Sequence, residues 1–250
     1  MNDNESRGHT RGRPNEANED AFEADDHLGL YVVCDGSGAE EGGEEASRIA
    51  VAATRDHVAR LVEGRRFRSS SFSEETAAVA IEAAFDAVYR AASRDPSLAR
   101  MSTTITMLLL TSERAVVGHV GDSRLYLASD RGLAQLTVDH PSTKLTEGVT
   151  VVGVDTFSIR VRPGDVFLLC TDGLRSALED EDWVLEQLQA PSISSAARRI
   201  LERAAAVEPD VDATVVLVRV ADDVPRACVQ HSSSWVAGAF SELTFAGSLA

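Results

Sequence analysis

Short apolar runs broken by polar turns fill much of the chain, and their Val- and Tyr-rich composition is typical of strands. The middle of the chain is especially dense in such runs. The short breaks between them have hairpin spacing, which predicts an antiparallel meander. A turn at Pro163-Gly164-Asp165 likewise predicts a hairpin of its two flanking runs. We expect strands at 28–34, 103–110, 115–120, 124–127, 134–136, 157–161, 166–170 and 214–220.

Apolar residues recur at helical spacing in a few longer segments. Ser71 followed by Glu74 has the spacing of a capping box and predicts a helix start. Strands and helices come in blocks instead of alternating strictly. This order favours an antiparallel α+β fold over a doubly wound parallel sheet. We expect helices over 44–62, from the cap at Ser71 to just before Pro96, over 181–189 and over 192–206.

The length of 250 residues fits one large domain. We expect a flexible N-terminal arm at 1–12, a folded domain at 13–222 and a tail at 223–250. In the tail the composition turns to Ser, Ala and Gly with isolated aromatic residues. Such a tail either frays or docks on the body or on a partner.

The formal net charge is −16, from 24 basic and 40 acidic residues. This balance argues against nucleic acid or an anionic membrane as the main partner. An acidic surface suits solubility, and it also suits a protein that holds cations or meets a basic partner. No run approaches the ~18 apolar residues of a membrane-spanning helix. Because Met1 to Asn18 also lacks the apolar stretch of a signal peptide, we expect a soluble cytoplasmic protein.

Acidic residues stand at the ends of several apolar runs. Carboxylates at strand ends are costly unless they are paired, hydrated or bound to a cation. A single Asp-Gly pair is usually a plain turn, so only the whole set is informative. The set suggests one oxygen-rich site for Mg²⁺ or Mn²⁺. Its members are Glu19, Asp20, Asp35, Asp122, Asp172 and Asp212.

An ordered series of segments makes the chain similar to the metal-dependent protein phosphatases of the PPM family, the type 2C Ser/Thr phosphatases, in their bacterial form. The segments are Asn18-Glu19-Asp20-Ala21, Asp35-Gly36-Ser37-Gly38 continuing to Gly43–Ser47, Ser102-Thr103-Thr104, Val120–Arg124, Thr137–His140, Leu169–Leu174 and Asp212–Val216. They run in family order from about Gly12 to Val220. The resemblance implies two packed antiparallel β-sheets flanked by helix pairs, a four-layer αββα sandwich with a two-metal cleft at one edge.

The resemblance also implies the roles of the site residues. Two Mn²⁺ or Mg²⁺ ions would be held by Glu19, Asp20, Asp35, the Gly36 carbonyl, Asp172 and Asp212. Asp35 would bridge the ions, while Glu19 and Asp20 would act through coordinated water. A third, weaker ion would lie near Asp122 and share Asp172. A metal-activated bridging water would then hydrolyse phosphoserine and phosphothreonine in proteins.

Because this chemistry needs no phosphoenzyme, neither Cys34 nor Cys170 has to be a nucleophile. Both cysteines lie inside apolar strand patterns, where we expect buried, reduced thiols. The implied partner is a phosphoprotein substrate, a Ser/Thr kinase or its target.

The chain departs from the family pattern at several positions. The usual phosphate-gripping arginine is replaced by Asn15, so Arg13 or Arg11 would have to substitute, unless both are solvated arm residues. Glu40 stands in place of a histidine, and Ala213 in place of an asparagine. His119 and His140 lie elsewhere, where we expect structural roles. The segment between His140 and Pro163 is short, which implies a reduced flap beside the cleft.

These departures keep other functions open. One alternative is a weakly active or degenerate phosphatase-fold binding module that regulates a kinase signalling or secretion assembly. Another keeps the metals but acts on small phosphate esters or a nucleotide second messenger. The chain has no Gly-rich phosphate loop of the P-loop type, which disfavours this last reading.

Overall fold

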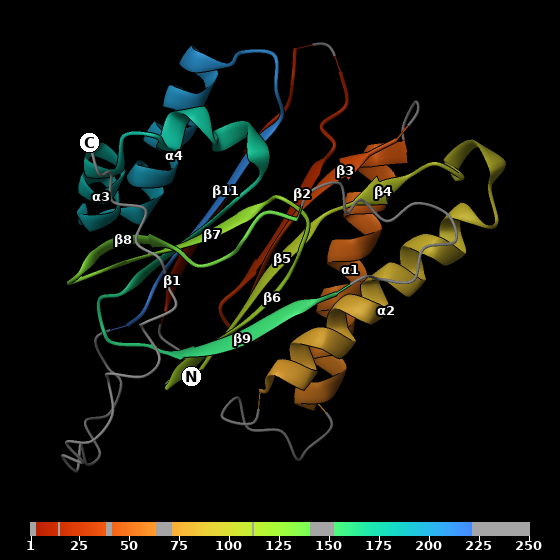
Figure 1. Ribbon diagram of the computed structural model, residues 1–250, viewed down its shortest axis with the longest axis horizontal. Coiled ribbons are helices and arrows are strands. Elements are labelled where there is room, and N and C mark those ends of the chain that lie inside the picture. The colour runs from red at the N-terminus through yellow and green to blue at the C-terminus, as the bar shows by residue number, and fades with distance from the viewer. Residues whose placement is uncertain are drawn as a thin grey trace.

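The computed structural model describes residues 4–14, 16–38, 42–63, 72–111, 113–140 and 153–221, which form two antiparallel sheets packed face to face (Figure 1). Within these residues the first sheet consists of β1 (Glu5–Arg11), β11 (Ala213–Arg219), β10 (Val166–Cys170), β7 (Arg124–Ser129) and β8 (Gly132–Gln135), in that order. The second consists of β2 (Asp20–Asp25), β3 (Leu30–Ser37), β5 (Ile105–Leu110), β6 (Arg114–Val120) and β9 (Asp155–Arg160). The short strand β4 (Ser102–Thr103) pairs with the end of β3.

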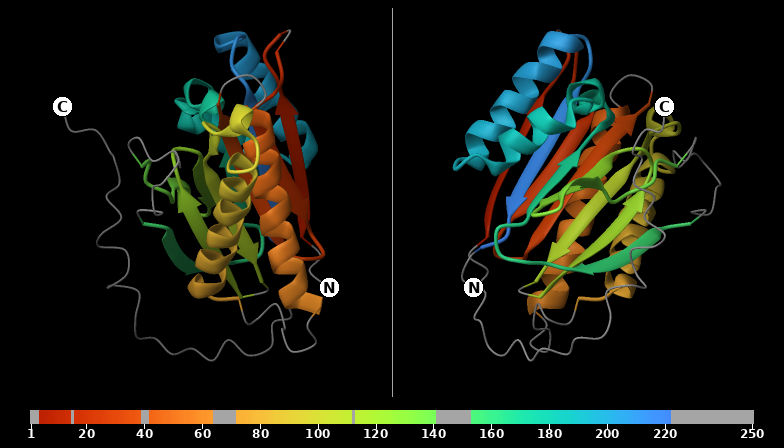
Figure 2. Two further views of the ribbon diagram at one scale, coloured as in Figure 1. Left: turned by 90° about the vertical axis from the view of Figure 1, so that its right-hand side faces the viewer. Right: turned by 60° about the vertical axis from the view of Figure 1, so that its left-hand side comes forward.

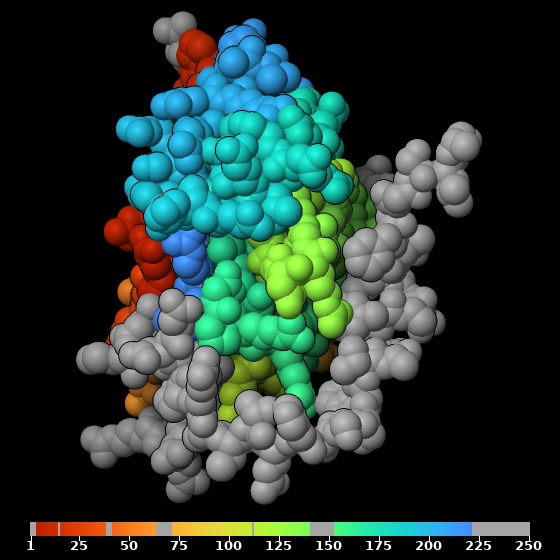
Figure 3. Space-filling model, turned by 90° about the vertical axis from the view of Figure 1, so that its left-hand side faces the viewer, coloured from red at the N-terminus to blue at the C-terminus, as the bar shows by residue number. Residues whose placement is uncertain are grey.

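Helix pairs cover the outer faces of the two sheets. The described helices are α1 (Gly42–Glu63), α2 (Glu74–Ala92), α3 (Glu181–Gln189) and α4 (Ile193–Val207), with short 3-10 turns at η2 (Pro96–Leu98), η3 (Asp172–Leu174) and η4 (Ser176–Leu178). The pair α1 and α2 lies on the second sheet, and α3 and α4 lie on the first (Figures 1 and 2). Figure 3 shows α3 and α4 over the upper part of their face, with strand side chains at the surface below them. The predicted four-layer αββα sandwich is confirmed.

The central strands bury both faces, which explains why they read as continuous apolar runs. In β3, Tyr31 and Val33 enter the core between the sheets, while Leu30, Val32 and Cys34 enter the core under α1 and α2. Strand β10 alternates in the same way between the inter-sheet core and the core under α3 and α4.

The first strand corrects the expectation of a flexible arm at 1–12. Residues 5–11 form β1, which pairs along its whole length with β11, from Glu5 opposite Arg219 to Arg11 opposite Ala213. The segment ESRGHTR lacks apolar alternation because an edge strand of this kind has little side-chain burial, and of its residues only Ser6 is buried. Backbone pairing therefore holds a strand that has no hydrophobic pattern.

The middle of the chain is not one continuous meander. Strands β5, β6 and β9 lie in one sheet, and β7 and β8 lie in the other, so the chain crosses between sheets after Val120. The predicted hairpin of 157–161 with 166–170 is also wrong, because β9 pairs with β6 while β10 pairs with β7 and β11. Strand β2, which the sequence pattern did not indicate, pairs with β3.

The second helix starts with a capping box formed by Ser73 and Thr76, not by the predicted Ser71 and Glu74. Ser71 itself, most of the expected flap segment and the tail at 223–250 lie outside the described residues. Among the helices that are described, none combines the length and the apolar composition needed to cross a membrane.

Candidate metal centre

Strands β2 and β3 bring two of the predicted ligands together at one edge of the second sheet. Their antiparallel register places Asp20 opposite Asp35. The Gly36 N–H donates to the Glu19 carbonyl oxygen at 2.9 Å, which continues this pairing one step further. The Asn-Glu-Asp segment and the Asp-Gly segment are therefore neighbours because of strand pairing.

Thr104 fixes the tip of β3. Its hydroxyl accepts from the Asp35 N–H at 3.0 Å, and its own N–H donates to the Asp35 carbonyl at 2.9 Å. The Thr103 hydroxyl donates to the same carbonyl at 3.0 Å. The Thr104 hydroxyl also lies 2.9 Å from the Ser123 hydroxyl, which ties the tip to the crossing between sheets. The Ser-Thr-Thr segment thus anchors two of the predicted ligand segments.

Two glycines allow the backbone at this edge to pack closely. A Cβ on Gly36 would lie 1.9 Å from the Gly43 carbonyl oxygen, and one on Gly43 would lie 2.2 Å from Glu19 Oε1. Neither contact is possible for a real side chain. The tip of β3, the first turn of α1 and Glu19 are therefore in contact only because both positions are glycine.

Asp212, which directly precedes β11 of the first sheet, connects that sheet to the edge formed by β2 and β3. Its carboxylate accepts from the N–H groups of Arg13 at 2.7 Å and Glu19 at 2.9 Å. The Thr171 hydroxyl donates to Asp20 Oδ2 at 2.7 Å and accepts from the Thr214 N–H at 3.0 Å. Predicted ligands from both sheets are thereby linked by direct hydrogen bonds.

Asp172 is exposed at the start of η3, directly after Thr171. The following residue, Gly173, comes so close to the last ligand that a Cβ there would lie 1.9 Å from the Asp212 carbonyl oxygen. The turn that carries Asp172 is therefore packed against the residue that precedes β11.

Burial dominates the electrostatics of Asp20. Desolvation raises the pKa of this carboxyl to about 7, against the lowering effect of hydrogen bonds from Thr171 and Thr214. The nearby charges of Asp212 and Asp172 raise the pKa further. Concentrated negative charge of this kind is what a bound cation relieves.

Arg13 lies among three acidic side chains. Its guanidinium contacts Glu19 at 3.0 Å, Glu16 at 3.2 Å and Asp212 at 3.4 Å. Arg11 instead donates to the carbonyls of Pro209 and Val211. Of the two arginines that we considered as phosphate-binding residues, Arg13 is the one beside the predicted ligands.

Asp122 occupies the crossing between β6 and β7 and is paired with an arginine that the sequence did not indicate. Arg175 Nη2 lies 2.9 Å from Asp122 Oδ2 and donates to the Asp122 carbonyl at 3.1 Å. Next to this pair, Arg124 binds Asp139 through Nε and Nη2 at 2.9 and 2.7 Å. A basic residue three positions after Asp172 was the only sequence signal for this pairing.

The donor chemistry fits hard divalent ions, because carboxylate and carbonyl oxygens from both sheets lie at one edge. The predicted ligand side chains do not surround a common ion position, however. Among the residues that the structure describes, no three His, Cys, Asp or Glu side chains form a group that could hold a metal ion. Arg13 instead pairs with Glu19 and Asp212.

The two histidines beside the crossing have hydrogen-bonded partners. His119 is fully buried, with Nδ1 2.9 Å from the Thr106 hydroxyl and Nε2 3.2 Å from the Val138 carbonyl. His140 Nε2 lies 2.9 Å from Asp155. These contacts support the structural roles that we expected.

Both strand cysteines are buried and free, as predicted. Burial raises the pKa of the Cys34 thiol well above its usual range and that of Cys170 to about 12. Thiols in this state are poor nucleophiles.

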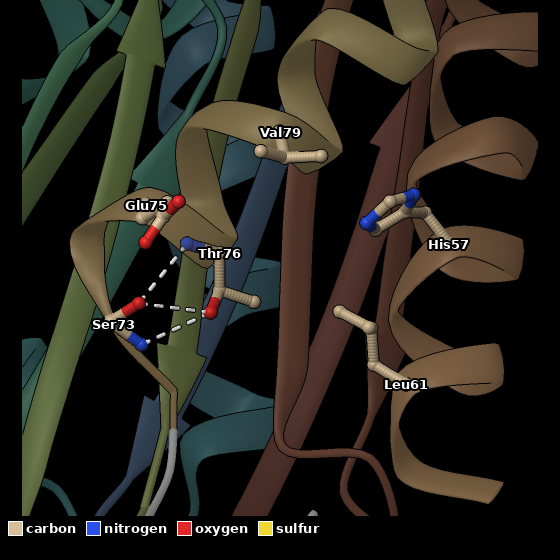
Figure 4. Close-up of a pocket in the computed structure, with 6 residues that line it drawn as sticks. All are labelled: His57, Leu61, Ser73, Glu75, Thr76 and Val79. Carbon is tan, nitrogen blue, oxygen red and sulfur yellow. Dashed lines mark hydrogen bonds between the residues drawn. The ribbon is translucent and has the colours of Figure 1, made fainter. Parts of the chain in front are cut away.

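A separate small pocket of about 260 Å³ lies between α1 and α2. Figure 4 shows its lining residues, His57, Leu61, Ser73, Glu75, Thr76 and Val79, including the capping box of α2. Its α1 residues stand 14 or more positions after Gly43, about 20 Å along the helix. The pocket is therefore remote from the carboxylates and smaller than a typical ligand site.

A four-layer αββα sandwich with acidic residues from both sheets at one edge defines the architecture of the metal-dependent phosphatases. The sequence of residues 7–220 matches the protein phosphatase 2C family, and the chain belongs to this family.

Named relatives agree with this assignment. The chain is 31% identical over 235 residues to the serine/threonine protein phosphatase PstP of Mycobacterium tuberculosis, covering 85% of this chain but only 44% of that protein. The chain thus spans less than half the length of this relative. It is 27% identical to the serine/threonine phosphatase stp of Listeria welshimeri, covering 83% of this chain and 92% of that protein.

A crystal structure of the catalytic domain of PstP in complex with two manganese ions superposes with a TM-score of 0.77. The identity is 27%, and the match covers 88% of this chain and 99% of that one.

Proposed function

We propose that this chain is a Mn²⁺- or Mg²⁺-dependent phosphatase that hydrolyses phosphoserine and phosphothreonine in proteins. The observation that carries the proposal is the convergence of Asp20 and Asp35 from one sheet with Asp212 from the other, next to the turn of Asp172. Membership of the protein phosphatase 2C family supports it. The related PstP structure is a complex with two manganese ions, which supports metal dependence in this chain.

The residues that would hold two ions are Glu19, Asp20, Asp35, the Gly36 carbonyl, Asp172 and Asp212. When bound, the ions supply activation of a water molecule and neutralise charge on the phosphoryl oxygens. Thr104 holds the backbone of Asp35, and Thr171 orients the buried carboxylate of Asp20. These hydrogen bonds keep the ligands in place before any ion arrives.

Arg13 is the residue that we propose for gripping the substrate phosphate. Its guanidinium already lies beside Glu19 and Asp212, 30% exposed, and it carries a bidentate donor set suited to phosphate. Ions at these carboxylates would compete with the Arg13 guanidinium, which contacts one oxygen each of Glu19 and Asp212. The arginine is then available to a phosphate at the same edge.

The proposal is tested by measuring hydrolysis of a phosphothreonine peptide with and without Mn²⁺. We expect strictly Mn²⁺-dependent turnover, and a loss of about 100-fold or more in Asp172→Asn because an anionic ligand becomes neutral. Asp130→Asn is the matched control, since Asp130 is 69% exposed and pairs only with Arg162 among the residues described. Turnover without metal, or an unaffected Asp172→Asn variant, contradicts the mechanism.

The finer assignments extend this proposal. The substrate would be a phosphoprotein that is itself a Ser/Thr kinase or a target of one, and the enzyme would act in the cytoplasm. A phosphoproteome comparison of cells with and without the gene would identify which sites accumulate phosphate.

A degenerate binding module is the second candidate function. The observation that favours it is the pairing of Arg13 with Glu19 and Asp212, which places a fixed positive charge against two of the proposed ligands. Titration calorimetry separates the candidates, because a binding module without catalysis would take up no Mn²⁺ at these carboxylates.

A further inference from the structure

The family resemblance implies a third, weaker ion near Asp122, and the structure does not fit that ion. Arg175 Nη2 contacts both the Oδ2 atom of Asp122, at 2.9 Å, and its carbonyl oxygen, at 3.1 Å. These are the oxygens with which this residue would bind a cation. The Nη2 atom of Arg175 already contacts both of these Asp122 oxygens.

We infer that Arg175 takes the place of the third ion, as a built-in positive charge at Asp122, so that this chain binds no divalent ion there. This inference depends on the proposed function in one respect only, namely that two other ions bind to this chain. It concerns a residue for which neither the family resemblance nor the comparisons suggested a role.

The backbone fixes both partners of this pair. The Arg175 N–H donates to the Asp172 carbonyl at 2.9 Å, so the arginine stands directly behind the proposed ligand Asp172. On the other side, Ser123 is held by the Thr104 hydroxyl at 2.9 Å, and its carbonyl accepts from the Thr106 hydroxyl at 3.1 Å. The residue that follows Asp172 by three positions is therefore held by its backbone, while its guanidinium reaches Asp122.

A second arginine–aspartate pair lies beside the first. Arg124 binds Asp139 with two short contacts, and Arg175 lies 3.7 Å from the same carboxylate. Two arginines thus face the carboxylates of Asp122 and Asp139. A divalent ion at Asp122 would either meet the repulsion of Arg175 or have to displace a hydrogen-bonded ion pair.

The test is to count bound Mn²⁺ ions on the full chain by equilibrium dialysis with metal analysis. We expect Arg175→Met, which keeps a long side chain without its charge, to bind one more Mn²⁺ per chain than the wild type. We expect the double variant Arg175→Met/Asp122→Asn to lose that additional ion. Asp122→Asn alone should leave the wild-type count unchanged.

Arg162→Met is the matched control for net charge, because Arg162 is 62% exposed and pairs with Asp130 away from this crossing. It should not raise the count. Arg175→Gln, which keeps an amide donor for the Asp122 carbonyl, is the second neutral variant, and thermal unfolding checks that each variant is folded.

Equal counts in the wild type and in both neutral variants would overturn the inference. So would the loss of an ion from the wild type on Asp122→Asn, or a gain in Arg162→Met. A wild type that binds no Mn²⁺ contradicts the proposed function instead, while the gain at Asp122 in Arg175→Met would still be measurable.

Discussion

At the scale of single residues, the candidate site depends on backbone segments that touch. The turn of Asp172 meets Asp212 at Gly173, and the tip of β3 meets α1 at Gly36. Each contact leaves no room for a methyl group. The spacing of the carboxylates is therefore set partly by the absence of side chains between them.

Gly173→Ala should weaken Mn²⁺ binding at least tenfold, because the new Cβ would lie 1.9 Å from the Asp212 carbonyl oxygen and one backbone segment must move. Calorimetric titration with Mn²⁺ measures the change. Gly164→Ala is the control. Its φ of +86° makes alanine unfavourable by about 1 kcal/mol, but nothing lies within 4 Å of its Cβ position and Mn²⁺ affinity should stay at the wild-type value. Equal losses in both variants would contradict the role of the contact.

The predicted ligand aspartates could be found from the sequence, but the arginines that pair with them could not. Asp35, Asp172 and Asp212 were recognisable because each borders an apolar run within a family motif. The choice between Arg13 and Arg11 depended on how the chain enters β2, and the pairing of Arg175 with Asp122 depended on a contact across 53 positions. Spacing along a chain carries no information about such contacts.

At the scale of elements, hydrophobic pattern located the buried strands and missed the polar ones. Strand β10 and helix α3 have the predicted bounds, and most other predicted elements differ by a few residues at their ends. Strands β1 and β2 escaped prediction because their residues are mostly only partly buried. The assignment of β7 and β9 to different sheets also escaped, since a polar break looks the same whether the chain turns back or crosses over.

Deletion of residues 1–11 should lower the free energy of unfolding by roughly 3 kcal/mol or more, because the hydrogen bonds of a paired strand contribute about 1 kcal/mol each. The deletion removes all seven residue pairs between β1 and β11. Urea unfolding followed by circular dichroism measures the loss. Deletion of residues 1–3 leaves every one of those pairs and serves as the control. A stability unchanged by the longer deletion would show that β1 is dispensable.

At the scale of the whole molecule, the candidate metal centre is shared between two sheets. Asp20 and Asp35 belong to one, and Asp172 and Asp212 border strands of the other. The distance between these pairs depends on the side chains packed between the sheets. The inter-sheet core should thus affect ion binding as well as stability.

A matched pair of substitutions tests this dependence. Phe167 is fully buried between the sheets, while Phe85 of α2 is buried in the core that α1 and α2 form with the second sheet. Truncation of either to alanine should cost about 3–5 kcal/mol of unfolding free energy. Only Phe167→Ala should also lower Mn²⁺ affinity, by several-fold at a temperature where both variants are folded. The same affinity in both variants would show that the site is insulated from the packing between the sheets.

The pairing of β1 with β11 has a consequence for how the protein is made. In translation Arg219 follows its partner Glu5 by 214 positions, which takes about 10–40 s at ordinary rates of translation. During that interval a nascent chain can pair β2 with β3 and bring Asp20 to Asp35, yet it has no Asp212. A partly synthesised chain therefore cannot complete the proposed ion site, and the proposed activity would require translation of nearly the whole domain.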